Sequence, residues 1–269
     1  MKQRIVILGS ASGMPSAQRS SSSFILETVS QSYLFDAGEG TSTSILRYNI
    51  DYDKINTIFI SHMHPDHCVG LFSLIQMMYL LNREKTLEIY LPEESVSGVK
   101  NFLNTLYLFP EKLSFDIYFY TIKPGLFFED SYLKVKAYPN LHLAENEKIM
   151  RTPKVKRHQE IEKEKLSNKM ESFSFEIAFK NKKVVYSGDV GGLDDLKMII
   201  HNADILITEC MHLDIERLLD LIKKSKVKST IFSHIPPELE KEKEGITKKA
   251  NDLKIKNFQF AFDGLSLLL

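Results

Sequence analysis

The chain has 269 residues, of which 43% are hydrophobic and 26% charged, as in ordinary globular proteins with a large core. Basic and acidic residues number 35 each, so the composition gives no overall drive to bind nucleic acid or another polyanion. No apolar run is long enough to span a membrane, the N-terminus begins as a strand rather than a signal peptide, and the presence of only Cys68 and Cys210 favours a reducing cytoplasm.

Apolar runs of strand length alternate along the chain with segments of helical periodicity. The expected strands are Ile5–Leu8, Ser23–Val29, Tyr33–Phe35, Leu87–Tyr90, Phe115–Thr121, Tyr132–Tyr138, Phe173–Phe179, Lys183–Tyr186, Asp204–Thr208 and Thr230–Phe232. The expected helices are Cys68–Leu81, Val96–Leu108 and a segment that begins after His212 and ends near Ile222. This alternation predicts an α/β sandwich, formed as one domain over residues 1–269.

The segment Leu143–Met170 differs in composition from the rest of the chain. It is dense in lysine, arginine and glutamate, poor in large apolar residues, and without a clear period. We expect it to be an excursion loop or a short charged helix that leaves the core. Its sequence leaves open whether it acts as a lid, as a dimer arm or as a disordered loop.

Residues 61–67, with the sequence Ser-His-Met-His-Pro-Asp-His, place three imidazoles and one carboxylate within six positions. They follow the apolar run Thr57–Ile60 directly. Imidazole and carboxylate groups together suit zinc, iron or manganese. Burying them without a metal or a strong partner would be costly, so the alternative is a polar surface loop. The pattern favours a metal site.

Three further candidate ligands, His142, Asp189 and His234, each follow an apolar strand-like run. In an α/β fold, functional side chains gather in the loops at the ends of such strands. A lone histidine or aspartate at a strand end is more often a cap or a turn residue. Three of them in a chain that already carries the 61–67 motif indicate one shared metal centre.

Two motifs at the start of the chain connect these residues to a known family. They are Leu-Gly-Ser-Ala-Ser-Gly-Met-Pro at residues 8–15 and Phe-Asp-Ala-Gly-Glu-Gly-Thr at residues 35–41. Together with the 61–67 motif, they resemble the metallo-β-lactamase superfamily and, within it, the ribonuclease Z-like branch. The resemblance extends along nearly the whole chain. It implies a four-layer αβ/βα sandwich with a two-metal site at one edge.

The resemblance also implies which side chains hold the metals. Two divalent ions are expected, with zinc as the favoured ion and manganese or iron as alternatives. The first would be held by His62, His64 and His142, the second by Asp66, His67 and His234, and both by Asp189. Asp36 resembles the carboxylate that orients a ligand imidazole in this family, although it could equally be a plain turn carboxylate.

The implied reaction is attack on phosphorus by a hydroxide shared between two ions about 3.5–4 Å apart. Asp66 is assigned a catalytic role in addition to its role as a ligand. Glu209 and His212 are the candidates for delivering a proton to the leaving oxygen, because His212 lies twenty-two residues before His234, as in the family. The loop between Glu209 and His212 is shorter than is usual in the family. The alternative is that His212 begins a helix and Glu209 is its structural partner.

The chain departs from the tRNA-processing members of the branch at two places. The charged segment 143–170 stands where those enzymes carry a glycine- and proline-rich arm, and His234 is followed by Ile-Pro-Pro-Glu. Prolines donate no backbone hydrogen bond, and Glu238 would repel a phosphate. We therefore expect a small or cyclic phosphodiester as substrate and do not favour nucleic acid. No membrane partner is expected, and a homodimer is a possible assembly.

Three other functions remain open at this stage. The same metal site would also hydrolyse an ester, a thioester or a lactone. A tRNA 3′-end-processing ribonuclease without its usual arm is a second alternative. The third is a non-catalytic carrier that binds a metabolite, although a carrier would be expected to lose some of the seven ligands.

Overall fold

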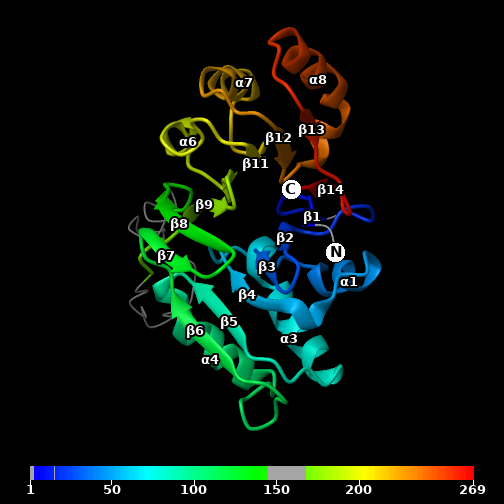
Figure 1. The fold of residues 1–269 in the computed structure, drawn as a ribbon, viewed down its shortest axis with the longest axis vertical. Helices are drawn as coiled ribbons and strands as arrows, with labels where there is room; N and C mark the ends of the chain where they lie inside the picture. Colours follow the sequence, from blue (N-terminus) through cyan, green and yellow to red (C-terminus); the bar gives the residue numbers. More distant parts are fainter. Residues whose placement is uncertain (1–2, 15, 145–167) are drawn as a thin grey trace, which may run out of the picture.

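The computed structural model describes residues 3–14, 16–144 and 168–269, so most of the predicted excursion 143–170 lies outside the described residues. Two seven-stranded sheets face each other, and helices cover the outer face of each one (Figure 1). This is the four-layer αβ/βα sandwich that the sequence predicted, and the prediction is confirmed. No helix in the described ranges combines the length and the apolar character that a membrane span requires.

The first sheet is antiparallel on one side of β3 and parallel on the other. Its strands, in spatial order, are β14 (Ser266–Leu268), β1 (Arg4–Gly9), β2 (Ser23–Glu27), β3 (Ser32–Phe35), β4 (Ile55–Phe59), β5 (Leu87–Leu91) and β6 (Ile117–Thr121). The strand pairs β3–β4, β4–β5 and β5–β6 are the parallel ones, so their carboxyl ends lie at one edge of the sheet.

The second sheet has the same organisation, with its parallel strands at one side. Its strands, in spatial order, are β13 (Phe258–Phe260), β12 (Thr230–Ser233), β11 (Ile205–Glu209), β10 (Lys182–Tyr186), β9 (Phe173–Phe179), β8 (Leu133–Pro139) and β7 (Gly125–Glu129). Strands β10 to β13 are parallel and again end at one edge.

Alternation of apolar side chains along each strand produces the layers. On β1, Ile5 and Ile7 belong to the buried cluster between the sheets, whereas Val6 and Leu8 pack toward the helices outside the first sheet. The outer helices are α1 (Thr41–Arg47), α3 (Gly70–Leu80) and α4 (Val96–Thr105) on the first sheet, and α6 (Leu193–Lys197), α7 (Ile215–Lys224) and α8 (Lys243–Asp252) on the second. The described residues also form three short 3-10 turns: η1 (Tyr52–Lys54), η2 (Glu93–Ser95) and η3 (Pro237–Lys241).

The structure differs from the sequence prediction at several borders. The predicted helix Cys68–Leu81 is divided into α2 (Pro65–Cys68) and α3, with Val69 between them. At this junction the backbone of Gly70 touches that of Gly38, so closely that a Cβ on Gly70 would lie 1.9 Å from the Gly38 carbonyl oxygen. Helix α1 and the edge strand β7 were not predicted from the sequence. The close contact at Gly70 holds the segment with the histidine motif against the loop after β3.

Candidate active site

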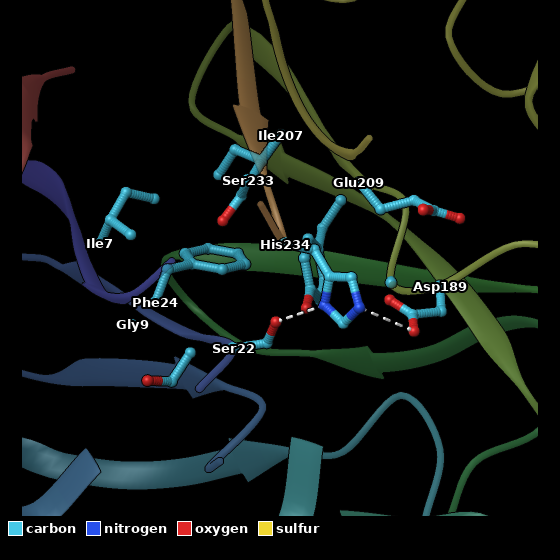
Figure 2. A pocket seen from close by; sticks show the side chains of 12 residues that line it. Ile7, Gly9, Ser22, Phe24, Asp189, Ile207, Glu209, Ser233 and His234 are labelled. Carbon is cyan, nitrogen blue, oxygen red and sulfur yellow. Dashed lines mark hydrogen bonds and ion pairs between the residues drawn. The ribbon is translucent and has the colours of Figure 1, made fainter. Parts of the chain in front are cut away.

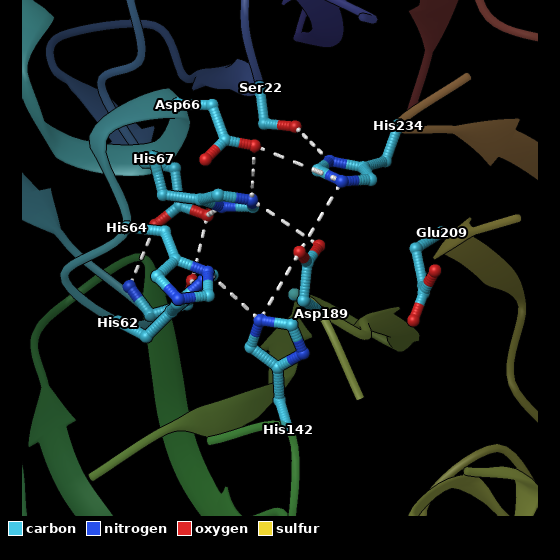
Figure 3. A network of polar contacts seen from close by, with 12 residues as sticks. Ser22, His62, His64, Asp66, His67, His142, Asp189, Glu209 and His234 are labelled. Atoms are coloured by element: carbon cyan, nitrogen blue, oxygen red, sulfur yellow. Dashed lines mark hydrogen bonds and ion pairs between the residues drawn. The ribbon is translucent and has the colours of Figure 1, made fainter. Parts of the chain in front are cut away.

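Loops from both sheets bring the seven predicted ligands together. His62, His64, Asp66 and His67 follow β4 of the first sheet, whereas the other three follow strands β8, β10 and β12 of the second. Figure 3 shows their side chains converging on one small volume at the edge where the two sheets meet. The grouping therefore follows from the topology, because strands of both sheets end at this edge.

The first group of potential metal ligands consists of His62, His64, His142 and Asp189, each offering one atom, all within 4.8 Å of one another. Nδ1 of His64 lies 3.0 Å from Nε2 of His142, and Nε2 of His142 lies 3.6 Å from Oδ2 of Asp189. Burial lowers the pKa of His142 to about 4 and that of His62 well below its usual range. Both imidazoles are thus kept neutral, which is the form that binds a metal ion.

The second group consists of Asp66, His67, His234 and, again, Asp189, within the same 4.8 Å limit. Nε2 of His67 lies 3.3 Å from Oδ1 of Asp189, and Nε2 of His234 lies 3.3 Å from Oδ2. Oδ2 of Asp66 lies 3.6 Å from Nε2 of His67 and 3.8 Å from Nε2 of His234. Asp189 therefore stands between the two groups, with one oxygen toward His67 and the other toward His142 and His234.

Several polar atoms in the site are buried without a hydrogen-bond partner among the described residues. They are Nε2 of His62, Nε2 of His67 and Oδ1 of Asp189. Leaving a buried polar atom unsatisfied costs about 1–3 kcal/mol, so native proteins seldom do it without a reason. All three atoms belong to the two ligand groups, and their donor set of imidazole nitrogen and carboxylate oxygen suits zinc, iron or manganese. The residues present thus fit divalent metal ions.

Hydrogen bonds behind the ligand groups fix the direction in which the imidazoles of His67 and His234 point. Nδ1 of His67 lies 2.7 Å from Oδ2 of Asp36, which also accepts hydrogen bonds from the hydroxyls of Ser61 and Tyr186, at 2.8 and 2.6 Å. Nδ1 of His234 lies 2.9 Å from Oγ of Ser22, as the dashed line in Figure 2 shows. Each contact leaves Nε2 of the histidine free to face the site.

Replacing Asp36 with alanine is expected to weaken metal binding by about 10–100-fold, because His67 loses the partner that holds its ring. Metal affinity of purified protein, measured by competition with a chelator dye, checks this expectation. The matched control is Asp130→Ala, because Asp130 also accepts a hydrogen bond from a buried tyrosine hydroxyl, that of Tyr33, but is not among the ligand groups. Equal metal affinity in the Asp36 variant and the control would contradict the assigned role of Asp36.

Glu209 and His212 lie in contact at the rim of the same site. The buried carboxylate of Glu209 accepts hydrogen bonds from the backbone N–H groups of Val190 (3.1 Å), Met211 (3.0 Å) and His212 (2.8 Å). Its Oε2 also lies 3.1 Å from Nδ1 of His212, and this hydrogen bond raises the pKa of the imidazole. The His212 side chain is 34% exposed, and its Nδ1 lies 3.9 Å from Oδ2 of Asp189. His212 can therefore hold a proton beside the ligand groups.

Sequence reasoning missed the roles of Ser22 and Tyr186. Ser22 lies 212 positions from His234 along the chain, and Tyr186 lies 150 positions from Asp36. A serine in a Ser-rich run and a tyrosine at a strand end carry no local signal of such contacts. Their position at strand ends near the motifs was the only available indication.

Comparisons with known proteins give a consistent result. Residues 3–251 match the family model described as anti-Pycsar protein Apyc1. The ribonuclease Z of Pyrococcus furiosus is 30% identical over 267 residues, which cover 87% of this chain and 86% of the relative. Among solved structures, human tRNase Z, short form, has a TM-score of 0.72 at 21% identity, with 98% of each chain covered. The metallo-beta-lactamase fold protein YhfI from Bacillus subtilis has a TM-score of 0.74 at 17% identity, with 99% of each chain covered.

Proposed function

Because the chain belongs to the Apyc1 family and to the ribonuclease Z-like branch of the metallo-β-lactamase superfamily, we propose that it hydrolyses small cyclic phosphodiesters such as cyclic nucleotides. The enzyme class follows from the family: the chain is a metal-dependent hydrolase of the phosphodiesterase type. The proposal adds the number of metal ions, the substrate and the roles of individual residues to this class.

The observation that carries the proposal is the pair of ligand groups that share Asp189. We assign His62, His64 and His142 to one ion, Asp66, His67 and His234 to the other, and Asp189 to both. Two divalent ions, with zinc as the expected species, would supply an activated water and neutralise charge in an in-line displacement at phosphorus. Asp66, whose Oδ2 faces both His67 and His234, completes the second group.

The chain's own contribution to bond breaking is a proton. His212 is partly exposed at the rim, and its hydrogen bond with Glu209 favours the protonated imidazole. Glu209 is itself fixed by three backbone donors, so the pair is held in one orientation. We assign His212 the delivery of a proton to the leaving oxygen and Glu209 the positioning of His212.

A small substrate is supported by the backbone that follows His234. The N–H of Ile235 donates to the carbonyl of Ser10 at 2.9 Å, and the carbonyl of Ile235 accepts from the N–H of Ser12 at 3.3 Å. The next two residues are prolines without a donor, and Glu238 is exposed just beyond them. Since Ile235, Pro236 and Pro237 offer no free backbone donor to a polynucleotide phosphate, we favour cyclic nucleotides over the RNA that the name ribonuclease Z indicates for the relatives.

Metal-stripped protein reloaded with zinc or manganese is expected to cleave bis(p-nitrophenyl) phosphate and to leave a p-nitrophenyl carboxylic ester nearly intact. The stripped protein is the control, and it should cleave neither compound. Turnover of 3′,5′-cyclic nucleotides and of a precursor tRNA by the reloaded protein then decides between the two substrate classes. Cleavage of the ester alone, or of the precursor tRNA alone, would contradict the proposed function.

A further inference from the structure

A groove of about 370 Å³ lies beside His212 and opens to solvent. Its walls come from the loops that carry Leu141, Gly191 and Leu213 and from the starts of α6 and α7. They include Gly192, Arg217 and the carboxylates of Asp194, Asp195 and Asp214. Its volume falls in the range of about 300–1,000 Å³ that is usual for small-molecule sites. The ligand groups do not fill it, since His212 is the only one of the assigned site residues in its wall.

Three segments of the groove wall adjoin site residues in the sequence. Leu141 precedes His142, Gly191 follows Asp189 by two positions, and Leu213 follows His212. The carboxylate of Asp195 joins two of the walls, because its Oδ2 accepts hydrogen bonds from the N–H of Leu141 at 3.1 Å and of Gly191 at 2.8 Å. The groove is therefore preformed, and its position relative to the ligand groups is fixed.

The position of His212, the proposed proton donor, indicates which part of a substrate would lie in the groove. A proton donor must lie within hydrogen-bond reach of the oxygen that leaves. The group attached to that oxygen then lies next to His212, and His212 lines the groove. In a cyclic nucleotide, the leaving oxygen stays attached to the nucleoside, so the nucleoside would occupy the groove.

The lining suits a nucleobase, which has flat apolar faces and polar edges. Leu141, which is 65% exposed, offers apolar surface, and Arg217 offers a guanidinium group that can stack on a base and donate hydrogen bonds to its edge. Within residues 3–14, 16–144 and 168–269, no side chain or carbonyl makes a hydrogen bond with that guanidinium; its backbone N–H alone is bonded, to Asp214.

We propose that this groove is the nucleoside subsite of the enzyme, with Arg217 as the residue that recognises the base. The inference rests on the proposed function for its substrate class. It adds a specific location and a specific residue to that function, and both can be tested by binding without any turnover.

Gly192 allows the groove to be blocked. Its backbone is extended, with φ of 167°, and a Cβ placed on it meets no heavy atom within 4 Å. A phenylalanine at this position can therefore be accommodated by the backbone and would project into open space at the groove. Gly245 on α8 gives the matched control, because a Cβ there also meets nothing within 4 Å, and Gly245 does not line the groove.

Calorimetry on the zinc-loaded protein would compare binding of a nucleoside 5′-monophosphate with binding of ribose 5-phosphate. In the wild type and in Gly245→Phe, the base is expected to strengthen binding about tenfold, as for other bases held by stacking. In Gly192→Phe, this advantage should disappear, while ribose 5-phosphate still binds. Arg217→Gln, an exposed substitution that does not threaten the fold, should remove part of the advantage, and Arg47→Gln on α1 should remove none.

Two outcomes would overturn the subsite: equal binding of both ligands by the wild type, or an undiminished advantage of the base in Gly192→Phe and Arg217→Gln. Measuring the turnover of cyclic nucleotides tests the proposed reaction independently of the proposed subsite. Base-dependent binding by a protein that cleaves no cyclic nucleotide would refute the proposed reaction and keep the subsite. Cleavage of cyclic nucleotides at equal rates by the wild type and Gly192→Phe would refute the subsite and keep the reaction.

Discussion

Replacing Asp189 with alanine is expected to lower phosphodiester turnover by about 10³-fold or more, since several kcal/mol of transition-state stabilisation depend on the metal site. Asp189 is 2% exposed and is the one residue that belongs to both ligand groups. Its two oxygens face histidines of both groups, His67 on one side and His142 and His234 on the other. Loss of this carboxylate removes a ligand from each proposed ion at once.

The measurement is kcat/KM for bis(p-nitrophenyl) phosphate together with the metal content per chain. Asp220→Ala on the exposed side of α7 is the control for removal of a carboxylate, and it should retain turnover and metal. Asp189→Asn keeps the shape of the side chain and tests whether the charge is needed. Undiminished turnover in an Asp189→Ala protein that holds no metal would refute the metal-dependent mechanism. A loss of one ion only would show that Asp189 does not bridge the pair.

Sequence reasoning could select the seven candidate ligands because their signal is local. The motif from His62 to His67 concentrates groups that are costly to bury, and each remaining ligand follows a strand-like apolar run. In an α/β fold, such positions meet at one edge, and the structure places all seven side chains there. The layer order of the sandwich was likewise predictable, because it follows from alternating elements and the family motifs.

Other features had no local signal. The hydrogen bond between Ser22 and His234 and the groove beside His212 depend on how distant loops pack, which side-chain type and spacing do not encode. Edge strand β7 was missed because its run Gly125–Glu129 is short and lies next to another apolar segment. The identity of the native metal, the homodimer and the role of segment 143–170 stay predictions.

The close approach between Glu209 and His212 explains why the short loop between them is compatible with the proposed role. Only Cys210 and Met211 separate the two residues, and the backbone turns so tightly that Glu209 accepts hydrogen bonds from both Met211 N–H and His212 N–H. The tight turn itself therefore brings Nδ1 of His212 to the carboxylate. A longer loop is not required for this contact.

His212→Ala is expected to slow the hydrolysis of a cyclic nucleotide by about 10²–10⁴-fold, the usual contribution of a general acid. The reason is that an alkoxide leaves slowly unless it receives a proton as the bond to phosphorus breaks. The same variant should cleave bis(p-nitrophenyl) phosphate at nearly the rate of the wild type, because the p-nitrophenolate anion is stable at neutral pH and leaves without a proton. The rates on the two substrates are measured side by side.

Comparing the rates on the two substrates distinguishes the loss of a proton donor from a general disturbance of the active site. A variant that merely disturbs the ligand groups would lose activity on both substrates in proportion, and such a result would refute the role of His212 as proton donor. His201→Ala, which removes an exposed histidine outside both ligand groups, should change neither rate. Glu209→Gln should show the same selectivity as His212→Ala in weaker form, because it removes the negative charge that favours the protonated imidazole. Its single amide oxygen can still accept the hydrogen bonds from the N–H groups of Met211 and His212.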